Sequence, residues 1–127
     1  MEALRYARHL EEEQKKIAAL IKSEGGETVE RIQRIVALAK RAKEAGTKII
    51  VTNPSPSRQG KSDEQLKTQA AALNKLGHEL AGLGMKLAYH NHDVELQFAA
   101  REFHHMMVGT DPEAVSLCLD AHWVYRG

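Results

Sequence analysis

Two clusters of imidazole and carboxylate side chains are the residues of this chain best suited to chemistry. The first cluster comprises His90, His92, Asp93 and Glu95, and the second comprises Asp120 and His122. Imidazole and carboxylate ligands suit Mn, Zn, Co or Fe better than Ca. A carboxylate at such an ion can also move a proton, as isomerisation next to a carbonyl requires.

Both clusters end short apolar runs, residues 86–91 and 115–120, which we interpret as buried strands. In α/β proteins the carboxyl ends of parallel strands are where chemistry takes place. Neighbouring parallel strands lie about 4.8 Å apart, so the two clusters could converge on one ion. Along the first strand, His90 and His92 share one face and Asn91 takes the other.

Each candidate also has a purely structural interpretation. A single histidine at a strand end is commonly a packing residue. Two histidines, an aspartate and a glutamate within residues 90–95 make the functional and the structural interpretation about equally good. Asp120 favours a function, because a carboxylate after an apolar strand is costly unless it is paired or bound to metal. Trp123 could stack on a sugar ring or simply pack. The loop side chains of Ser57, Arg58 and Lys61 could hold a phosphate or sugar hydroxyls, although a solvated loop explains them better.

Hydrophobic spacing and stop signals predict the elements that position these residues. Ser62 and Gln65 form a capping box that starts one of the helices. The predicted helices cover residues 2–22, 28–45, 62–82 and 96–108, and the predicted strands cover 47–53, 86–91 and 115–120.

The order α-α-β-α-β-α-β predicts an α/β fold with right-handed crossovers and parallel strands. We interpret residues 1–127 as one partial-barrel domain, because a (β/α)8 TIM barrel needs about 250 residues. Helices cover one face of such a sheet, so we expect self-association, as a homodimer or larger, to cover the other. The alternative is a small three-layer sandwich whose first two helices fold across the open face.

Composition excludes several other classes of protein. The chain has 127 residues, 43% hydrophobic and 28% charged, with a formal net charge of +1. This balance does not indicate a nucleic-acid partner, and no apolar run is long enough for a membrane span or a signal peptide. The single cysteine, Cys118, fits a reducing, cytoplasmic setting.

Residues 87–96 (LAYHNHDVEL) and 117–127 (LCLDAHWVYRG) resemble the sugar phosphate isomerase/epimerase family, the xylose isomerase-like TIM barrels. Residues 45–53 (AGTKIIVTN) are similar to the preceding strand of that family, and the resemblance covers the middle portion of its barrel. It implies a divalent metal (Mn, Zn, Co, Mg or Fe) held by Glu, Asp, His and Glu from successive strands. The two glutamates also shuttle the proton between substrate carbons.

Carried onto this sequence, the resemblance implies Glu95 as the first metal ligand and catalytic group, with His90 as the alternative ligand, and Asp120 as the second ligand. The substrate-contacting or outer-shell residues would be His92, His122, Trp123 and Asn53. The remaining ligands are expected on strands beyond Gly127, and this leaves open whether the chain is an enzyme.

The sequence therefore predicts a fragment of a divalent-metal-dependent sugar isomerase or epimerase barrel. Its chemistry, if it is active, would be proton transfer through an enediolate on a small sugar or sugar phosphate. The alternative is a non-catalytic, self-associating barrel fragment, natural or engineered, whose ligand residues are relics. A weaker third option is a metal-binding protein without turnover.

Overall fold

The computed structural model describes residues 8, 12, 15 and 29–127. Within these described residues, three strands form one parallel sheet in the order β1-β2-β3. The strands are β1 (Ile49–Thr52), β2 (Lys86–His90) and β3 (Val115–Cys118). The α/β class and the parallel strands predicted from the sequence are therefore confirmed, whereas the predicted helix over 2–22 lies outside the described residues.

Helices α2 (Val29–Glu44), α3 (Asp63–Gly82) and α4 (Gln97–Gly109) connect and flank these strands. Helix α3 begins with the predicted capping box: the Gln65 amide donates to Ser62 Oγ at 3.2 Å, and the Ser62 amide donates to Gln65 Oε1 at 2.8 Å. These two bonds satisfy amide groups that a helix start otherwise leaves without partners.

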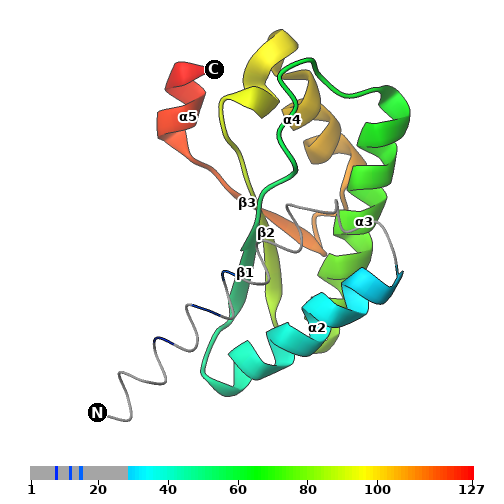
Figure 1. The fold of residues 1–127 in the computed structure, drawn as a ribbon, viewed down its shortest axis with the longest axis vertical. Coiled ribbons are helices and arrows are strands. Elements are labelled where there is room, and N and C mark those ends of the chain that lie inside the picture. The colour runs from blue at the N-terminus through cyan, green and yellow to red at the C-terminus, as the bar shows by residue number, and fades with distance from the viewer. Residues whose placement is uncertain (1–7, 9–11, 13–14, 16–28) are drawn as a thin grey trace.

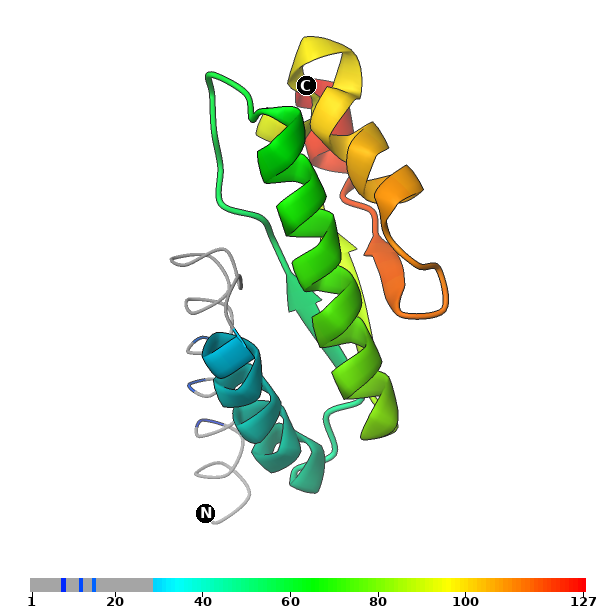
Figure 2. The same cartoon turned by 90° about the vertical axis from the view of Figure 1, so that its right-hand side faces the viewer.

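The three helices lie on the same face of the sheet (Figures 1 and 2). Between helices and sheet is one apolar core, which includes Ile35 of α2, Leu66 and Leu80 of α3, Leu87 of β2 and Met106 of α4. All five are at most 2% exposed, so each stabilises the fold by about 2 kcal/mol through burial. No helix in the described ranges is both long and apolar enough to cross a bilayer.

The other face of the sheet carries exposed apolar side chains. Ile49 is 52% exposed and Val51 is 43% exposed. Val51 is in register with Ala88 of β2, and residues alternate between faces along a strand. His90 therefore belongs to this same open face, at the carboxyl end of β2.

The last part of the chain differs from its prediction. Strand β3 ends at Cys118 rather than at residue 120, and a short helix, α5 (Ala121–Arg126), follows it. Strand β3 is also only partly buried, since Leu117 is 43% exposed. Asp120 begins α5, because its side chain accepts a hydrogen bond from the His122 amide at 3.0 Å.

The start of α4 has an unusual backbone. A 3-10 turn, η1 (Val94–Leu96), precedes the helix. Phe98, Ala99 and Ala100 then have φ values of 56°, 59° and 56°, in the left-handed region. Each such residue costs about 1–2 kcal/mol relative to right-handed helix. The Phe98 ring covers Gly60, where a side chain would lie 3.4 Å from the ring.

Ala99→Gly is expected to stabilise the protein by up to about 1 kcal/mol, because glycine adopts positive φ without steric cost. Ala71→Gly is the matched control, since Ala71 is also exposed but lies within α3. It should destabilise the protein by about 1 kcal/mol. Urea unfolding monitored by circular dichroism measures both. A loss of stability in Ala99→Gly equal to that in Ala71→Gly would contradict the left-handed turn.

Candidate functional site

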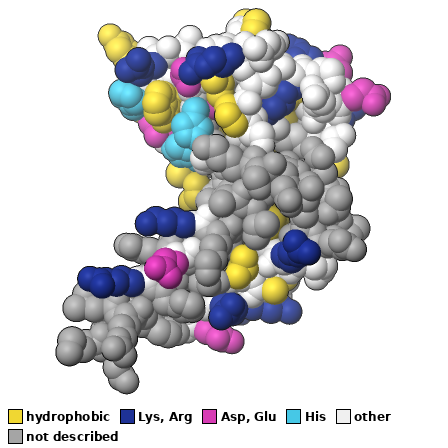
Figure 3. Space-filling view, viewed as in Figure 1, with side chains coloured by type: hydrophobic (Ala, Val, Ile, Leu, Met, Phe, Trp, Pro, Cys, Tyr) yellow, Lys and Arg dark blue, Asp and Glu magenta, His cyan; other side chains and the backbone are white. Residues whose placement is uncertain are grey.

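The carboxyl ends of β2 and β3 bring the two predicted clusters together. His90, the last residue of β2, lies with its Nε2 3.0 Å from Asp120 Oδ2. The two side chains are 21% and 31% exposed, so the pair is within reach of a ligand in solution. Figure 3 shows histidine and acidic side chains gathered at the upper end of the molecule.

The Asn91 side chain fixes the spacing of the two loops. Its Oδ1 accepts the Asp120 amide hydrogen at 2.9 Å, and its Nδ2 donates to the Asp120 carbonyl at 3.3 Å. Asn91 is fully buried, so both bonds form away from competing water. From the sequence, Asn91 was predicted only to face away from the histidines. Its side chain pairs with the backbone of a residue 29 positions later, and no local sequence pattern signals such a contact.

Imidazole and indole rings line the same edge. The His90 and His92 ring centroids lie 4.8 Å apart, and the His92 and Trp123 centroids lie 5.6 Å apart. The His122 ring centroid lies 5.0 Å from that of Trp123, and these two residues belong to α5. Asn53 directly follows β1 at the same edge of the sheet. The predicted substrate-contacting residues thus lie at the edge that carries His90.

Glu95 lies deeper than the other candidates. It is fully buried, and its Oε2 accepts the His92 amide hydrogen at 2.5 Å and lies 4.0 Å from His92 Nδ1. Its other oxygen, Oε1, has no hydrogen-bond partner among the residues that the structure describes. Burial raises the pKa of Glu95 above its usual value, and the charge of Glu102 adds to this, although hydrogen bonds from the backbone oppose it.

Glu102 is a second buried carboxylate, and it is paired with a cation. Glu102 Oε1 pairs with Lys61 Nζ at 2.6 Å and accepts a hydrogen bond from Gln69 Nε2 at 3.0 Å. The Tyr89 hydroxyl is buried and has no hydrogen-bond partner within the described part of the chain. Burial raises the pKa of Tyr89, and the charges of Glu95 and Glu102 raise it further. Lys61 is thus not a solvated loop residue, because its side chain is 11% exposed and holds Glu102.

Asp120 differs from Glu95 in its electrostatics. Partial desolvation alone would raise the pKa of Asp120. The hydrogen bond from His90 and those from the Trp123 and His122 amides together outweigh it, so the pKa lies below its usual value. Asp120 is therefore a carboxylate at neutral pH, which is the form that binds a cation.

The described residues contain one pair of side chains with the chemistry of metal ligands, but no complete metal site. No three His, Cys, Asp or Glu side chains in this part of the chain are arranged to hold a metal ion. His90 and Asp120 are adjacent donors of the right chemistry, but a protein metal site needs three or four ligands. The structure does not join Glu95 to this pair, so its predicted role as a metal ligand stays a prediction.

Glu95→Gln is expected to stabilise the protein at neutral pH but not at about pH 4, the pKa region of an unfolded glutamate. The pKa of Glu95 is higher in the folded than in the unfolded protein. The stability of the parent relative to this variant is therefore greatest below the pKa of the unfolded state. That relative stability is lost as the pH rises through the pKa of the folded state. Thermal unfolding between pH 4 and 8 measures this. Glu79→Gln, at an exposed position of α3, should follow the parent, and a pH-independent effect of Glu95→Gln would contradict the raised pKa.

Comparison with known protein families gives a match across most of the chain. The family model described as xylose isomerase-like TIM barrel matches residues 7–127. That span includes both clusters of candidate site residues.

Individual proteins match over smaller parts of their own length. Two inosose dehydratases from strains of Clostridium perfringens are 40% identical over 67 residues, which is 52% of this chain and 23% of each relative. A sugar phosphate isomerase/epimerase structure from Parabacteroides distasonis superposes with a TM-score of 0.62 at 22% identity, covering 79% of this chain and 40% of that one. This structural likeness shows the fold alone.

Proposed function

Because this chain belongs to the xylose isomerase-like TIM barrel family, we propose that it carries part of the active site of a divalent-metal-dependent sugar isomerase, epimerase or dehydratase. The observation that supports this proposal most directly is the pairing of His90 with Asp120 at 3.0 Å, at the carboxyl ends of β2 and β3. That edge of a TIM barrel is where its active sites lie.

In this proposal each residue has a stated role. His90 and Asp120 hold the divalent cation together with ligands from outside the described residues. When bound, the cation polarises a substrate carbonyl and so acidifies the adjacent carbon. Glu95 exchanges the proton of that carbon by way of the His92 ring, which is 30% exposed and lies 4.0 Å from Glu95 Oε2. Trp123, His122 and Asn53 contact the sugar.

The substrate class follows from the chemistry of proton removal next to a carbonyl. Isomerisation and epimerisation return the proton to carbon, whereas dehydration expels a hydroxyl as water from the neighbouring carbon. The names of the inosose dehydratases make an inosose the first substrate to test. A ketose and a ketose phosphate are the other two candidates.

Solvent exchange tests the activity. The chain is incubated in deuterated water with Mn²⁺ and each substrate, and loss of the α-proton is followed by NMR after the metal is removed. Asp120→Asn is expected to slow exchange at least tenfold, whereas Glu113→Gln, at an exposed position before β3, should not. Exchange that persists equally with a chelator or in Asp120→Asn would contradict the metal-dependent mechanism.

A second candidate function is supported by the open face of the sheet. Ile49 and Val51 are exposed there by 52% and 43%, and a parallel sheet normally has both faces covered. We propose that a second copy of the chain covers this face, as a homodimer or larger assembly. In the non-catalytic version of this proposal, the ligand residues are relics and no exchange occurs. Tight metal binding without exchange would instead indicate a metal-binding protein.

Light scattering behind a sizing column tests the assembly. We expect a mass of at least twice the 14.2 kDa of one chain. Val51→Lys should reduce it to the monomer, because a charge on the covered face is costly to bury. The control is Val108→Lys at an exposed position of α4, 72% exposed, which should leave the mass unchanged. A folded monomer for the parent would exclude self-association.

A further inference from the structure

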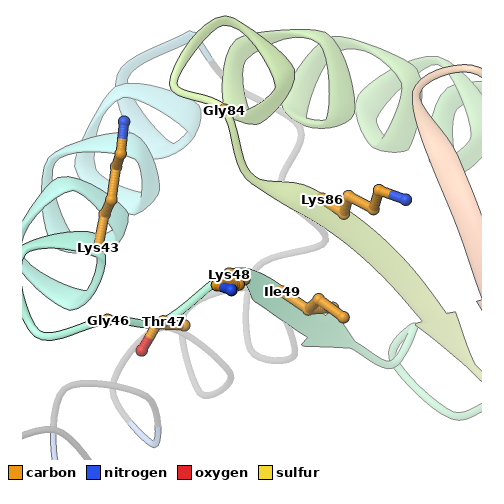
Figure 4. A pocket seen from close by; sticks show the side chains of 7 residues that line it. All are labelled: Lys43, Gly46, Thr47, Lys48, Ile49, Gly84 and Lys86. Atoms are coloured by element: carbon orange, nitrogen blue, oxygen red, sulfur yellow. The ribbon is translucent and has the colours of Figure 1, made fainter.

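A cavity of about 550 Å³ opens at the amino-terminal edge of the sheet, between α2 and the starts of β1 and β2 (Figure 4). Lys86 pairs with Ile49 in the strand register, so its side chain lies on the open face, whereas Lys48 lies on the opposite face. Figure 4 also shows Lys86 pointing away from Lys43. The described residues at this edge therefore focus on no common point, in contrast to those at the carboxyl edge.

Residues 93–100, at the carboxyl edge, hold two unfavourable arrangements at once. Phe98, Ala99 and Ala100 have φ values between 56° and 59°, and a left-handed backbone is unfavourable for each residue that carries a side chain. Glu95 is fully buried, and its Oε1 has no hydrogen-bond partner among the described residues. A buried carboxylate oxygen without a partner is also unfavourable. Because both arrangements fall in one short segment, a single rearrangement of its backbone would relieve both.

The segment lies between two anchored ends. Before it, the buried Asn91 side chain is joined to the backbone of Asp120 by two hydrogen bonds. After it, Arg101 Nη1 donates to the Lys61 carbonyl at 2.5 Å, and the neighbouring Glu102 pairs with Lys61 Nζ at 2.6 Å. The backbone between these anchors can therefore rearrange while both of its ends stay in place.

Local contacts hold the segment in its present position. Glu95 Oε2 accepts the His92 amide hydrogen at 2.5 Å. The Phe98 ring covers Gly60, where a side chain would lie 3.4 Å from the ring. Phe98 is nevertheless 59% exposed, so its release from Gly60 would bring little additional apolar surface into water.

The buried Glu95 carboxylate lies close to the candidate functional site. Glu95 Oε2 is 4.0 Å from His92 Nδ1, and the His92 ring centroid is 4.8 Å from that of His90. His90 in turn pairs with Asp120 at 3.0 Å. A small displacement of the segment would therefore bring the Glu95 carboxylate to the edge that carries this pair.

We propose that residues 93–100 are a latch with two positions. In the observed position, the left-handed turn at residues 98–100 keeps Glu95 buried. In the second position, these three residues join α4 as right-handed helix, and the Glu95 carboxylate becomes accessible beside His90 and Asp120. The role of the accessible carboxylate rests on the activity proposed above, whereas the latch itself requires neither metal nor sugar.

Amide hydrogen exchange of the full chain, followed by NMR, tests the latch. The His92 amide donates to Glu95 Oε2 at 2.5 Å, so its hydrogen exchanges with deuterium when the latch opens. Ala99→Gly should slow this exchange about threefold or more, because glycine adopts positive φ without strain. Ala99→Val should speed it about tenfold or more, because positive φ is especially unfavourable for a β-branched residue. Ala99 is exposed, so the larger side chain can extend into solvent.

The Asp120 amide is the control within the same molecule, because it donates to Asn91 Oδ1 outside the latch. Its exchange should be unchanged in both variants. Ala71→Val, at an exposed position of α3, should leave the exchange of the His92 amide unchanged. Equal acceleration of both amides in Ala99→Val, or a His92 exchange rate that does not depend on residue 99, would overturn the latch. The samples contain no metal and no sugar, so the result is independent of the substrate exchange that tests the proposed activity.

Discussion

Gly77→Ala is expected to lower the free energy of unfolding by about 3 kcal/mol, although alanine is normally the better helix residue. A side chain at this position of α3 would lie 2.4 Å from the carbonyl oxygen of Ala114 and 2.8 Å from its carbonyl carbon. These are backbone atoms next to β3, so no side-chain rotation can relieve the overlap. The helix would have to move away from the strand that leads to Asp120. Urea unfolding measures the loss.

Gly82→Ala is the matched control for this substitution. Gly82 is the last residue of the same helix, and a side chain there would meet nothing within 4 Å. Since its φ is not in the left-handed region, alanine should stabilise the protein by up to about 1 kcal/mol. A stability gain in both variants would show that α3 does not approach the backbone before β3 as closely as described.

Lys61→Met is expected to destabilise the protein by about 3 kcal/mol. The substitution keeps the apolar part of the side chain but leaves Glu102, 8% exposed, without the cation that lies 2.6 Å away. An unpaired carboxylate between α3 and α4 is costly, and the remaining hydrogen bond from Gln69 is too little to compensate for the lost ammonium. Thermal and urea unfolding at pH 7 measure the effect.

A double variant tests whether the loss of stability in Lys61→Met comes from the Glu102 carboxylate that is left buried without a cation. Lys61→Met/Glu102→Leu should return to within about 1 kcal/mol of the parent, because an apolar pair of similar volume can replace a buried ion pair. Arg58→Met is the control at an exposed pair, where Arg58 is 71% exposed and 3.9 Å from Asp93. It should change stability by less than about 0.5 kcal/mol. A double variant as unstable as Lys61→Met would contradict this account.

The helices and strands with strong local signals were predictable from the sequence. The capping box at Ser62 and Gln65 predicted the start of α3, and the β-branched run before Asn53 predicted β1. The meeting of His90 and Asp120 was also predictable, because parallel strands bring their carboxyl ends to one edge. Each of these inferences depends either on a pattern of residues close together in the sequence or on the topology of a parallel sheet.

The features that were not predictable depend on long-range or atypical contacts. Asp120 was interpreted as the end of a strand, although Asp is a good N-cap residue and starts α5 here. The left-handed turn at 98–100 contains no glycine or asparagine that would signal it. The buried partner of Lys61 lies 41 residues away in sequence, so no local pattern separates this lysine from a solvated one.

The buried amide of Asn91 has a practical consequence for detecting ligands. The Asp120 amide nitrogen donates to Asn91 Oδ1 at 2.9 Å, so its hydrogen exchanges with deuterium when this hydrogen bond between the ends of β2 and β3 opens. Any ligand that holds these two strand ends together should slow this exchange. Deuterium exchange at the Asp120 amide therefore reports whether a ligand occupies the site, and the measurement needs no catalytic turnover.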